Sequence, residues 1–198
     1  MLVGMLTNVA VLAFDGVAPF ELGVLHEAWG YDRSDEGLPV FDFAICAPEG
    51  RPVRTQAGFG MTVEHDLGRA AEADLIAVPA GADGYPVPEC VLETLREGLD
   101  RGARIMSLCT GAFVLGEAGL LDGRSCTTHW RHSARLAERF PLARVIPEVL
   151  YVDDDRVLTS AGTAAMLRHH FTKVRSVSPQ HDRRTFSSLR AVEAEQAG

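Results

Sequence analysis

Hydrophobic residues along this chain gather in short runs that alternate with longer amphipathic stretches. The strand-like runs cover residues 9–14, 41–47, 73–78 and 104–108. Apolar residues at helical spacing follow the first run over 17–29. A second helix is predicted from Pro88 to Gly102, because proline and glycine stand there in their usual places at a helix start and end.

The remaining pattern continues the same alternation. It predicts, in order, a hairpin over 53–63, a strand-like stretch over 125–128, a helix over 129–140, a hairpin over 149–160 and a last helix from about Thr163. Strands that alternate with helices favour a mostly parallel sheet with helices on both faces. We expect an α/β domain over 1–165 and a C-terminal helix with a basic tail over 166–198.

Composition fits an ordinary globular protein, with 46% hydrophobic and 23% charged residues among 198. No apolar run approaches the ~20 residues that span a bilayer, so no membrane contact is expected. The first residues lack a basic segment and a signal-peptide cleavage site. We therefore expect a cytoplasmic protein.

The net charge of −8 is unevenly distributed. Residues 1–165 carry 13 arginines against 24 acidic residues, a charge of −11, whereas 166–198 carry 6 basic against 3 acidic residues, a charge of +3. An acidic body is poorly suited to nucleic acid. The basic tail is either a solvated helix face or a segment that contacts phosphate.

The four cysteines, Cys46, Cys90, Cys109 and Cys126, lie far apart. Because there is no C-x-x-C pair, the spacing argues against a zinc site and against a disulfide framework. We expect separate thiols, no metal and no cofactor.

Cys109 stands at the most informative point of the chain. A predicted strand ends at Leu108, and a helix follows within two residues, which is the layout of a nucleophile elbow. This layout places the thiol at the carboxyl end of the sheet, where α/β folds bind ligands. Gly111 permits a close backbone approach, and the helix dipole predicts a lowered pKa for Cys109. The alternative is a buried cysteine that acts as a small hydrophobic residue.

Several blocks in this order resemble one known family. They are FDGVAPFELG (14–23), VPAG (78–81), CTGAFVLGEAGLLDGRSCTTHW (109–130) and LYVDDDRVLTSAGTAA (150–165). Over about 7–165 the chain resembles the ThiJ/PfpI, class I glutamine amidotransferase-like domain, and in particular the N-terminal ligand-sensing domain of AraC-family transcriptional regulators. The resemblance implies a flavodoxin-like three-layer sandwich.

The resemblance also implies roles for particular residues. Glu21 matches the carboxylic acid that lies beside the cysteine in this superfamily, and a protonated carboxyl there would stabilise the thiolate. Gly81 and Thr110 match the residues whose backbone N–H groups face the thiol. The alternatives are an ordinary exposed helix residue for Glu21 and a glycine that serves only its turn for Gly81.

Thr110 departs from the proteases of the superfamily, which have a histidine directly after the cysteine. His129 is the remaining candidate base, but it stands at a helix start, where Thr127 or Thr128 would cap the helix and the imidazole would satisfy a local backbone group. Isonitrile hydratases of the superfamily also have Cys-Thr, so a lyase-type activity stays open.

Residues 166–186, MLRHHFTKVRSVSPQHDRRTF, resemble the last part of an AraC-type DNA-binding domain. The chain thus looks like a sensing domain joined to a remnant of that domain, and coincidental similarity of a basic helix is the alternative. Apolar residues over 166–177 share one helical face, so we expect a helix packed on the body without specific DNA binding.

Three functions remain at this stage, and all use one pocket. The first is a non-catalytic sensing domain that binds a small molecule near Cys109, Gly81, Thr110, Gly111 and His129. We expect it to form a homodimer, and we expect DNA as a partner only of full-length relatives. The second is a hydratase or hydrolase in which Cys109 and Glu21 are catalytic. The third is a thiol redox sensor.

Overall fold

A six-stranded sheet forms the centre of the computed structural model, which describes residues 6–48, 52–82 and 84–162. In the spatial order β2-β1-β5-β6-β10-β9, its strands are β2 (Asp42–Cys46), β1 (Asn8–Leu12), β5 (Leu75–Val78), β6 (Arg104–Leu108), β10 (Val157–Ser160) and β9 (Tyr151–Asp154). Neighbouring strands are parallel except β9, which runs antiparallel to β10. The carboxyl ends of β1, β5, β6 and β10 therefore meet at one edge of the sheet.

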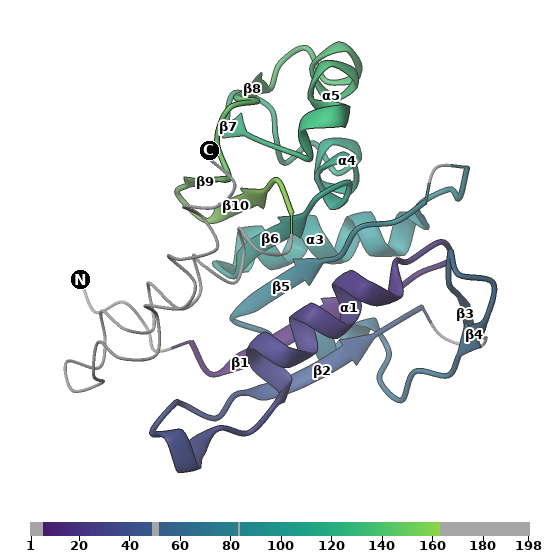
Figure 1. Ribbon diagram of the computed structural model, residues 1–198, viewed down its shortest axis with the longest axis vertical. Helices are drawn as coiled ribbons and strands as arrows, with labels where there is room; N and C mark the ends of the chain where they lie inside the picture. Colours follow the sequence, from purple (N-terminus) through teal and green to yellow (C-terminus); the bar gives the residue numbers. More distant parts are fainter. Residues whose placement is uncertain (1–5, 49–51, 83, 163–198) are drawn as a thin grey trace, which may run out of the picture.

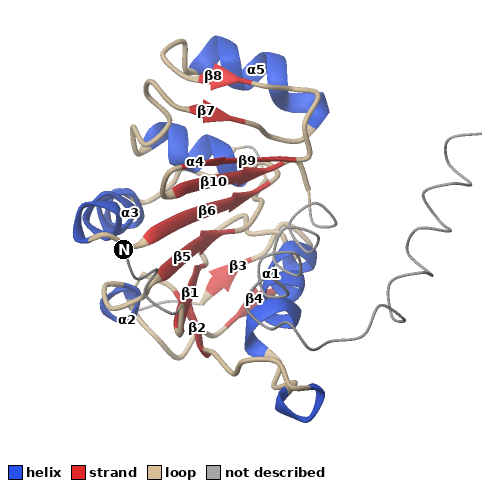
Figure 2. Cartoon of the chain, turned by 90° about the vertical axis from the view of Figure 1, so that its left-hand side faces the viewer, coloured by secondary structure: helices blue, strands red, loops and turns tan. Residues whose placement is uncertain are grey.

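Helices cover both faces of this sheet, as Figure 2 shows. On one face lies α1 (Pro19–Leu25), which continues into a π-helical turn over His26–Gly30. On the other lie α2 (Leu67–Ala70), α3 (Glu89–Arg101) and α4 (Gly111–Glu117).

The buried side chains of β1 explain these layers, because successive residues of a strand point to opposite faces. Val9 and Val11 pack in one hydrophobic cluster with Leu25 of α1, whereas Ala10 and Leu12 belong to the cluster that contains α3 and α4. The predicted α/β sandwich with a mostly parallel sheet is confirmed.

Two small sheets extend this core. The hairpin of β3 (Val53–Arg54) and β4 (Gly60–Met61) lies where it was predicted. Beyond β9, β7 (Ser125–Cys126) pairs in parallel with β8 (Arg144–Val145), next to α5 (Ser133–Arg139) and a 3₁₀ turn over Trp130–His132 (Figure 1). A second 3₁₀ turn covers Ser34–Glu36.

Most predicted elements are present with shifted ends. The helix predicted from Pro88 stops at Gly102 as expected, and this glycine adopts φ 107°, a conformation that ends helices readily because glycine has no Cβ. Three short elements were missed: α2, whose first turn is capped by the Asp66 carboxylate, strand β8, and the 3₁₀ turn over Ser34–Glu36. The helix predicted over 166–177 and the division of the chain at residue 165 lie outside the described residues.

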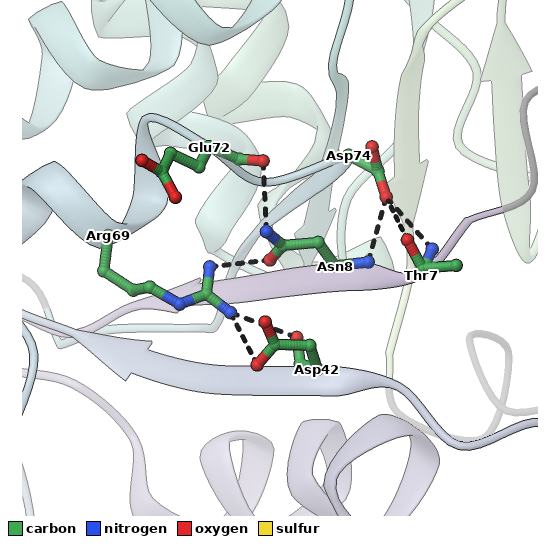
Figure 3. A network of polar contacts seen from close by, with 6 residues as sticks. All are labelled: Thr7, Asn8, Asp42, Arg69, Glu72 and Asp74. Carbon is green, nitrogen blue, oxygen red and sulfur yellow. Dashed lines mark hydrogen bonds and ion pairs between the residues drawn. The ribbon is translucent and has the colours of Figure 1, made fainter.

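A polar network fixes the amino ends of the first strands (Figure 3). Cys109 follows the carboxyl end of β6, so the network lies at the opposite edge of the sheet. The Arg69 guanidinium donates to the side-chain oxygen of Asn8 at 2.6 Å and pairs with the Asp42 carboxylate at 2.9 Å. The Asp74 carboxylate accepts the backbone N–H groups of Thr7 and Asn8 at 3.0 and 2.9 Å. These contacts hold β1, β2 and the start of β5 in register.

Within the part of the chain that the structure describes, no helix combines the length and the apolar character needed to cross a bilayer.

Candidate functional site

Cys109 occupies a sharp turn between β6 and α4. Its φ of 51° lies in the left-handed region, which costs a non-glycine residue on the order of 1–3 kcal/mol, so other contacts must hold the residue in this conformation. Its N–H donates to the Ser160 carbonyl at 2.9 Å, and its carbonyl accepts the Thr128 hydroxyl at 2.7 Å. Both backbone groups of Cys109 are therefore fixed, and the predicted strand, turn and helix are present.

Gly111 lets α4 begin directly against the end of β5. A Cβ at this position would lie 2.5 Å from the carbonyl oxygen of Val78 and 2.9 Å from that of Pro79. The close approach predicted for Gly111 is thus an approach to backbone, and it explains the glycine by packing. Ligand contact at this buried residue stays a prediction.

Thr110 connects the cysteine turn to the loop after β5. Its hydroxyl accepts the Gly81 N–H at 3.1 Å and donates to the Gly81 carbonyl at 3.0 Å. The Gly81 N–H is therefore directed at Thr110 and not at the thiol, which corrects the expectation from the sequence. The Thr110 backbone N–H lowers the pKa of the Cys109 thiol. The assignment of both residues to ligand binding remains a prediction.

The same loop positions the start of α1. The Ala18 N–H donates to the Ala80 carbonyl at 2.9 Å, and the Ala82 N–H donates to the Gly16 carbonyl at 2.8 Å. Because α1 begins directly after this contact, its first turn and Glu21 lie at the carboxyl edge of the sheet, on the side of Cys109.

Glu21 is half-buried and close enough for its negative charge to raise the pKa of Cys109. No hydrogen bond joins these two described residues in the structure. The structure thus brings the predicted pair into one site, while a catalytic role for either residue stays a prediction.

The pKa of Cys109 is raised, which is opposite to the direction predicted from the helix dipole. Burial of the half-exposed thiol is the largest cause; the Thr110 N–H lowers the pKa, and the Glu21 charge raises it. The prediction failed because it considered the helix start and omitted desolvation, which favours the neutral thiol. At neutral pH the Cys109 side chain is mainly a thiol.

His129 caps the turn over Trp130–His132. Its Nδ1 accepts the Arg131 N–H at 3.3 Å, so the expectation that the imidazole satisfies a local backbone group is confirmed. Because Nδ1 is occupied as an acceptor, Nε2–H is the group that the ring presents to its surroundings. Thr128 does not cap this turn, because its hydroxyl bonds the Cys109 carbonyl instead.

Sequence reasoning missed two residues that shape the site. Thr128 and Ser160 hold the Cys109 carbonyl and N–H, and both are buried. They stand inside the blocks TTHW and LTSAG, so the signal was present in the sequence, but only the fold shows what these residues touch. Among residues 6–48, 52–82 and 84–162, no three His, Cys, Asp or Glu side chains converge in a way that would hold a metal ion.

Comparison with known proteins gives one matching family and several relatives. The model of the DJ-1/PfpI family matches residues 7–175. The protein described as "Uncharacterized protein in cpoL 5'region" from Streptomyces lividans is 38% identical over 136 residues, which cover 68% of this chain and 95% of that protein.

Several relatives are named for a function, among them a transcriptional regulator and a hydratase. The HTH-type transcriptional regulator CdhR of Pseudomonas aeruginosa is 32% identical over 129 residues, which cover 64% of this chain and 38% of that protein. The isonitrile hydratase of Pseudomonas putida is 32% identical over 117 residues, which cover 58% of this chain and 50% of that protein. The chain thus spans half or less of the length of both relatives.

Among solved structures, an AraC family transcriptional regulator from Pseudomonas putida shares the fold. Its TM-score is 0.68 at 24% sequence identity, and the match covers 87% of this chain and 92% of that chain.

Proposed function

Since this chain belongs to the DJ-1/PfpI family, we propose that it is the ligand-sensing domain of an AraC-type transcriptional regulator and binds a small molecule beside Cys109. Similarity to an HTH-type transcriptional regulator supports this proposal. This chain spans 38% of that regulator, so DNA is proposed as a partner only of the longer relatives.

The observation that carries the proposal is the state of Cys109. Its left-handed turn presents a half-buried side chain at the carboxyl edge of the sheet, and burial together with the Glu21 charge favours the neutral thiol. A neutral thiol can contact a ligand but is poorly suited to attack it, because the thiolate is the nucleophile. His129, whose Nδ1 is occupied, offers no ready base. These features favour sensing over catalysis.

A thermal-shift screen of small metabolites tests the proposal. A ligand at about 100 times its dissociation constant stabilises the folded state by about 2.7 kcal/mol, which gives a clear shift. The same ligand is expected to slow the iodoacetamide labelling of Cys109 in a Cys90→Ser background, which removes the exposed thiol on α3. A ligand that stabilises the protein but leaves Cys109 labelling unchanged would show that it binds elsewhere.

A second candidate is a cysteine-dependent hydratase or hydrolase. Similarity to an isonitrile hydratase and the influence of Glu21 on Cys109 favour it. Hydration of an isonitrile adds one water molecule and yields an N-substituted formamide, which mass spectrometry detects. Steady formation of this product that is lost in Cys109→Ser would replace the sensing proposal.

A thiol redox sensor is the third candidate, and the raised pKa of Cys109 counts against it, because oxidation proceeds through the thiolate. The cytoplasmic setting and the homodimer remain predictions from the sequence. Sedimentation velocity on the purified chain tests the homodimer directly, and a monomer at all concentrations would contradict it.

A further inference from the structure

We propose that three side chains next to the Cys109 turn, His129, Trp130 and Arg131, form a donor rim that recognises a carboxylate group of the ligand. This inference rests on the proposed function, since it names the chemistry of the molecule bound there. It adds Trp130 and Arg131, which the sequence did not place in the site.

The position of the donor rim follows from one hydrogen bond. The Thr128 hydroxyl donates to the Cys109 carbonyl at 2.7 Å, so the residues that follow Thr128 start beside the cysteine turn. His129 is half-buried there, and its ring stacks on Trp130 with centroids 5.6 Å apart. The Arg131 guanidinium lies over the same indole, 5.7 Å from its centroid. Trp130 is 71% exposed, so this stack faces outward.

Every polar group of the donor rim is a donor. The occupied Nδ1 of His129 leaves Nε2–H, the guanidinium of Arg131 has only N–H groups, and the indole of Trp130 has one N–H. A set of donors without acceptors complements a group that only accepts, and among common organic groups the carboxylate also fits a guanidinium in charge and shape.

The charge of Arg131 is uncompensated in the described part of the chain. Other arginines pair with carboxylates, such as Arg69 with Asp42 and Arg139 with Glu117, but none of the described carboxylates pairs with Arg131. An exposed arginine that only meets solvent is the ordinary alternative. The contact with Trp130 argues against it, because it favours a position of the guanidinium beside the turn.

Intrinsic fluorescence gives a direct test. The chain has two tryptophans; Trp29 is 5% exposed and Trp130 is 71% exposed, so added solutes act mainly on Trp130. The probes are matched pairs of acid and amide, acetate with acetamide and benzoate with benzamide. We expect the acids to change the emission at concentrations about tenfold lower than their amides. Arg131→Gln should remove this preference and Arg131→Lys should keep part of it.

Arg144→Gln is the matched control, because it removes one exposed arginine of strand β8 and leaves the donor rim intact. This variant should behave as the wild type. Equal responses to acid and amide, or an unchanged preference in Arg131→Gln, would overturn the proposal. The proposal would also be overturned if the tryptophan emission changed with protein concentration but not with added acid, since Trp130 would then lie in a contact between copies of the chain.

A second measurement distinguishes failure of the donor-rim proposal from failure of the sensing proposal. The emission response to acetate and benzoate is measured without the sensed ligand, so it can be present even if the sensing proposal fails. In a Cys90→Ser background the acids should also slow the labelling of Cys109. An intact emission response without slower labelling would show that the donor rim does not belong to the Cys109 site, which overturns the proposal.

Discussion

The hydroxyl of Thr110 clamps the Gly81 backbone, accepting its N–H at 3.1 Å and donating to its carbonyl at 3.0 Å. This contact joins two segments that are 29 residues apart in the sequence. Because Gly81 neighbours the backbone contacts that position the start of α1, Thr110 links the cysteine turn to the element that carries Glu21.

Thr110→Val should therefore loosen both segments. The variant keeps the side-chain shape but leaves two half-buried backbone groups without their partner, so we expect a loss of about 1–3 kcal/mol in the free energy of unfolding, measured with urea. Thr110→Ser, which keeps the hydroxyl, should retain most of the stability. The control is Thr94→Val, which removes a hydroxyl bonded within helix α3 and should change stability by less than about 0.5 kcal/mol. Equal stability of Thr110→Val and wild type would refute the clamp.

Glu21→Gln should make Cys109 more reactive. The negative charge of Glu21 raises the pKa of Cys109, so the neutral amide should lower that pKa and move the onset of iodoacetamide labelling to lower pH. The family resemblance instead implied a protonated Glu21 that stabilises the thiolate. Glu27→Gln is the control, since Glu27 pairs with Arg33. A shift to higher pH in Glu21→Gln would restore the view of Glu21 as a proton donor.

Cys90, and not Cys109, should be the first thiol to react near neutral pH. Cys90 is exposed, Cys109 is half-buried with a raised pKa, and Cys46 and Cys126 are buried. From the sequence, Cys109 is expected to be the most reactive of the four thiols, because it combines a helix start with a position in a cleft. Mass mapping after short exposure to iodoacetamide decides between the two orders, and urea should expose Cys46 and Cys126 as a check on the assay. Preferential labelling of Cys109 would show that the turn activates the thiol despite its burial.

The sequence predicts what is local and periodic in this fold. The apolar run before Cys109 and the glycine after it suffice to place a strand, a turn and a helix. Short elements without such a run, β8 and α2, depend on tertiary contacts and were missed.

Long-range hydrogen bonds account for what the sequence could not predict in the site. The partners of Cys109 on Thr128 and Ser160 come from other elements, and the hydroxyl of Thr110 occupies the N–H of Gly81. The direction of the Cys109 pKa shift depends on how far the thiol is buried, and a sequence pattern gives no measure of that.

The last prediction concerns Cys46 and Cys126 and the free energy of unfolding at alkaline pH. Burial is the largest cause that raises the pKa of each thiol to about 11; Arg69 opposes it and Asp66 adds to it at Cys46, while Asp154 adds to it at Cys126. A thiol in the unfolded chain has a pKa of about 8.5. Between these values the unfolded state binds fewer protons than the folded state, so stability is complete below about pH 8.5 and falls as the pH rises toward 11.

For each of the two buried thiols, the free energy of unfolding should be lower by on the order of 2–3 kcal/mol at about pH 11 than at about pH 8.5. Urea denaturation at several pH values under reducing conditions measures the loss. Cys126→Ala should be slightly less stable than wild type at pH near 8, because of the small cavity, yet it should lose less stability on alkalinisation. Cys90→Ser removes an exposed thiol and should follow the wild-type curve. Parallel curves for Cys126→Ala and wild type would mean that the Cys126 thiol does not control the alkaline transition.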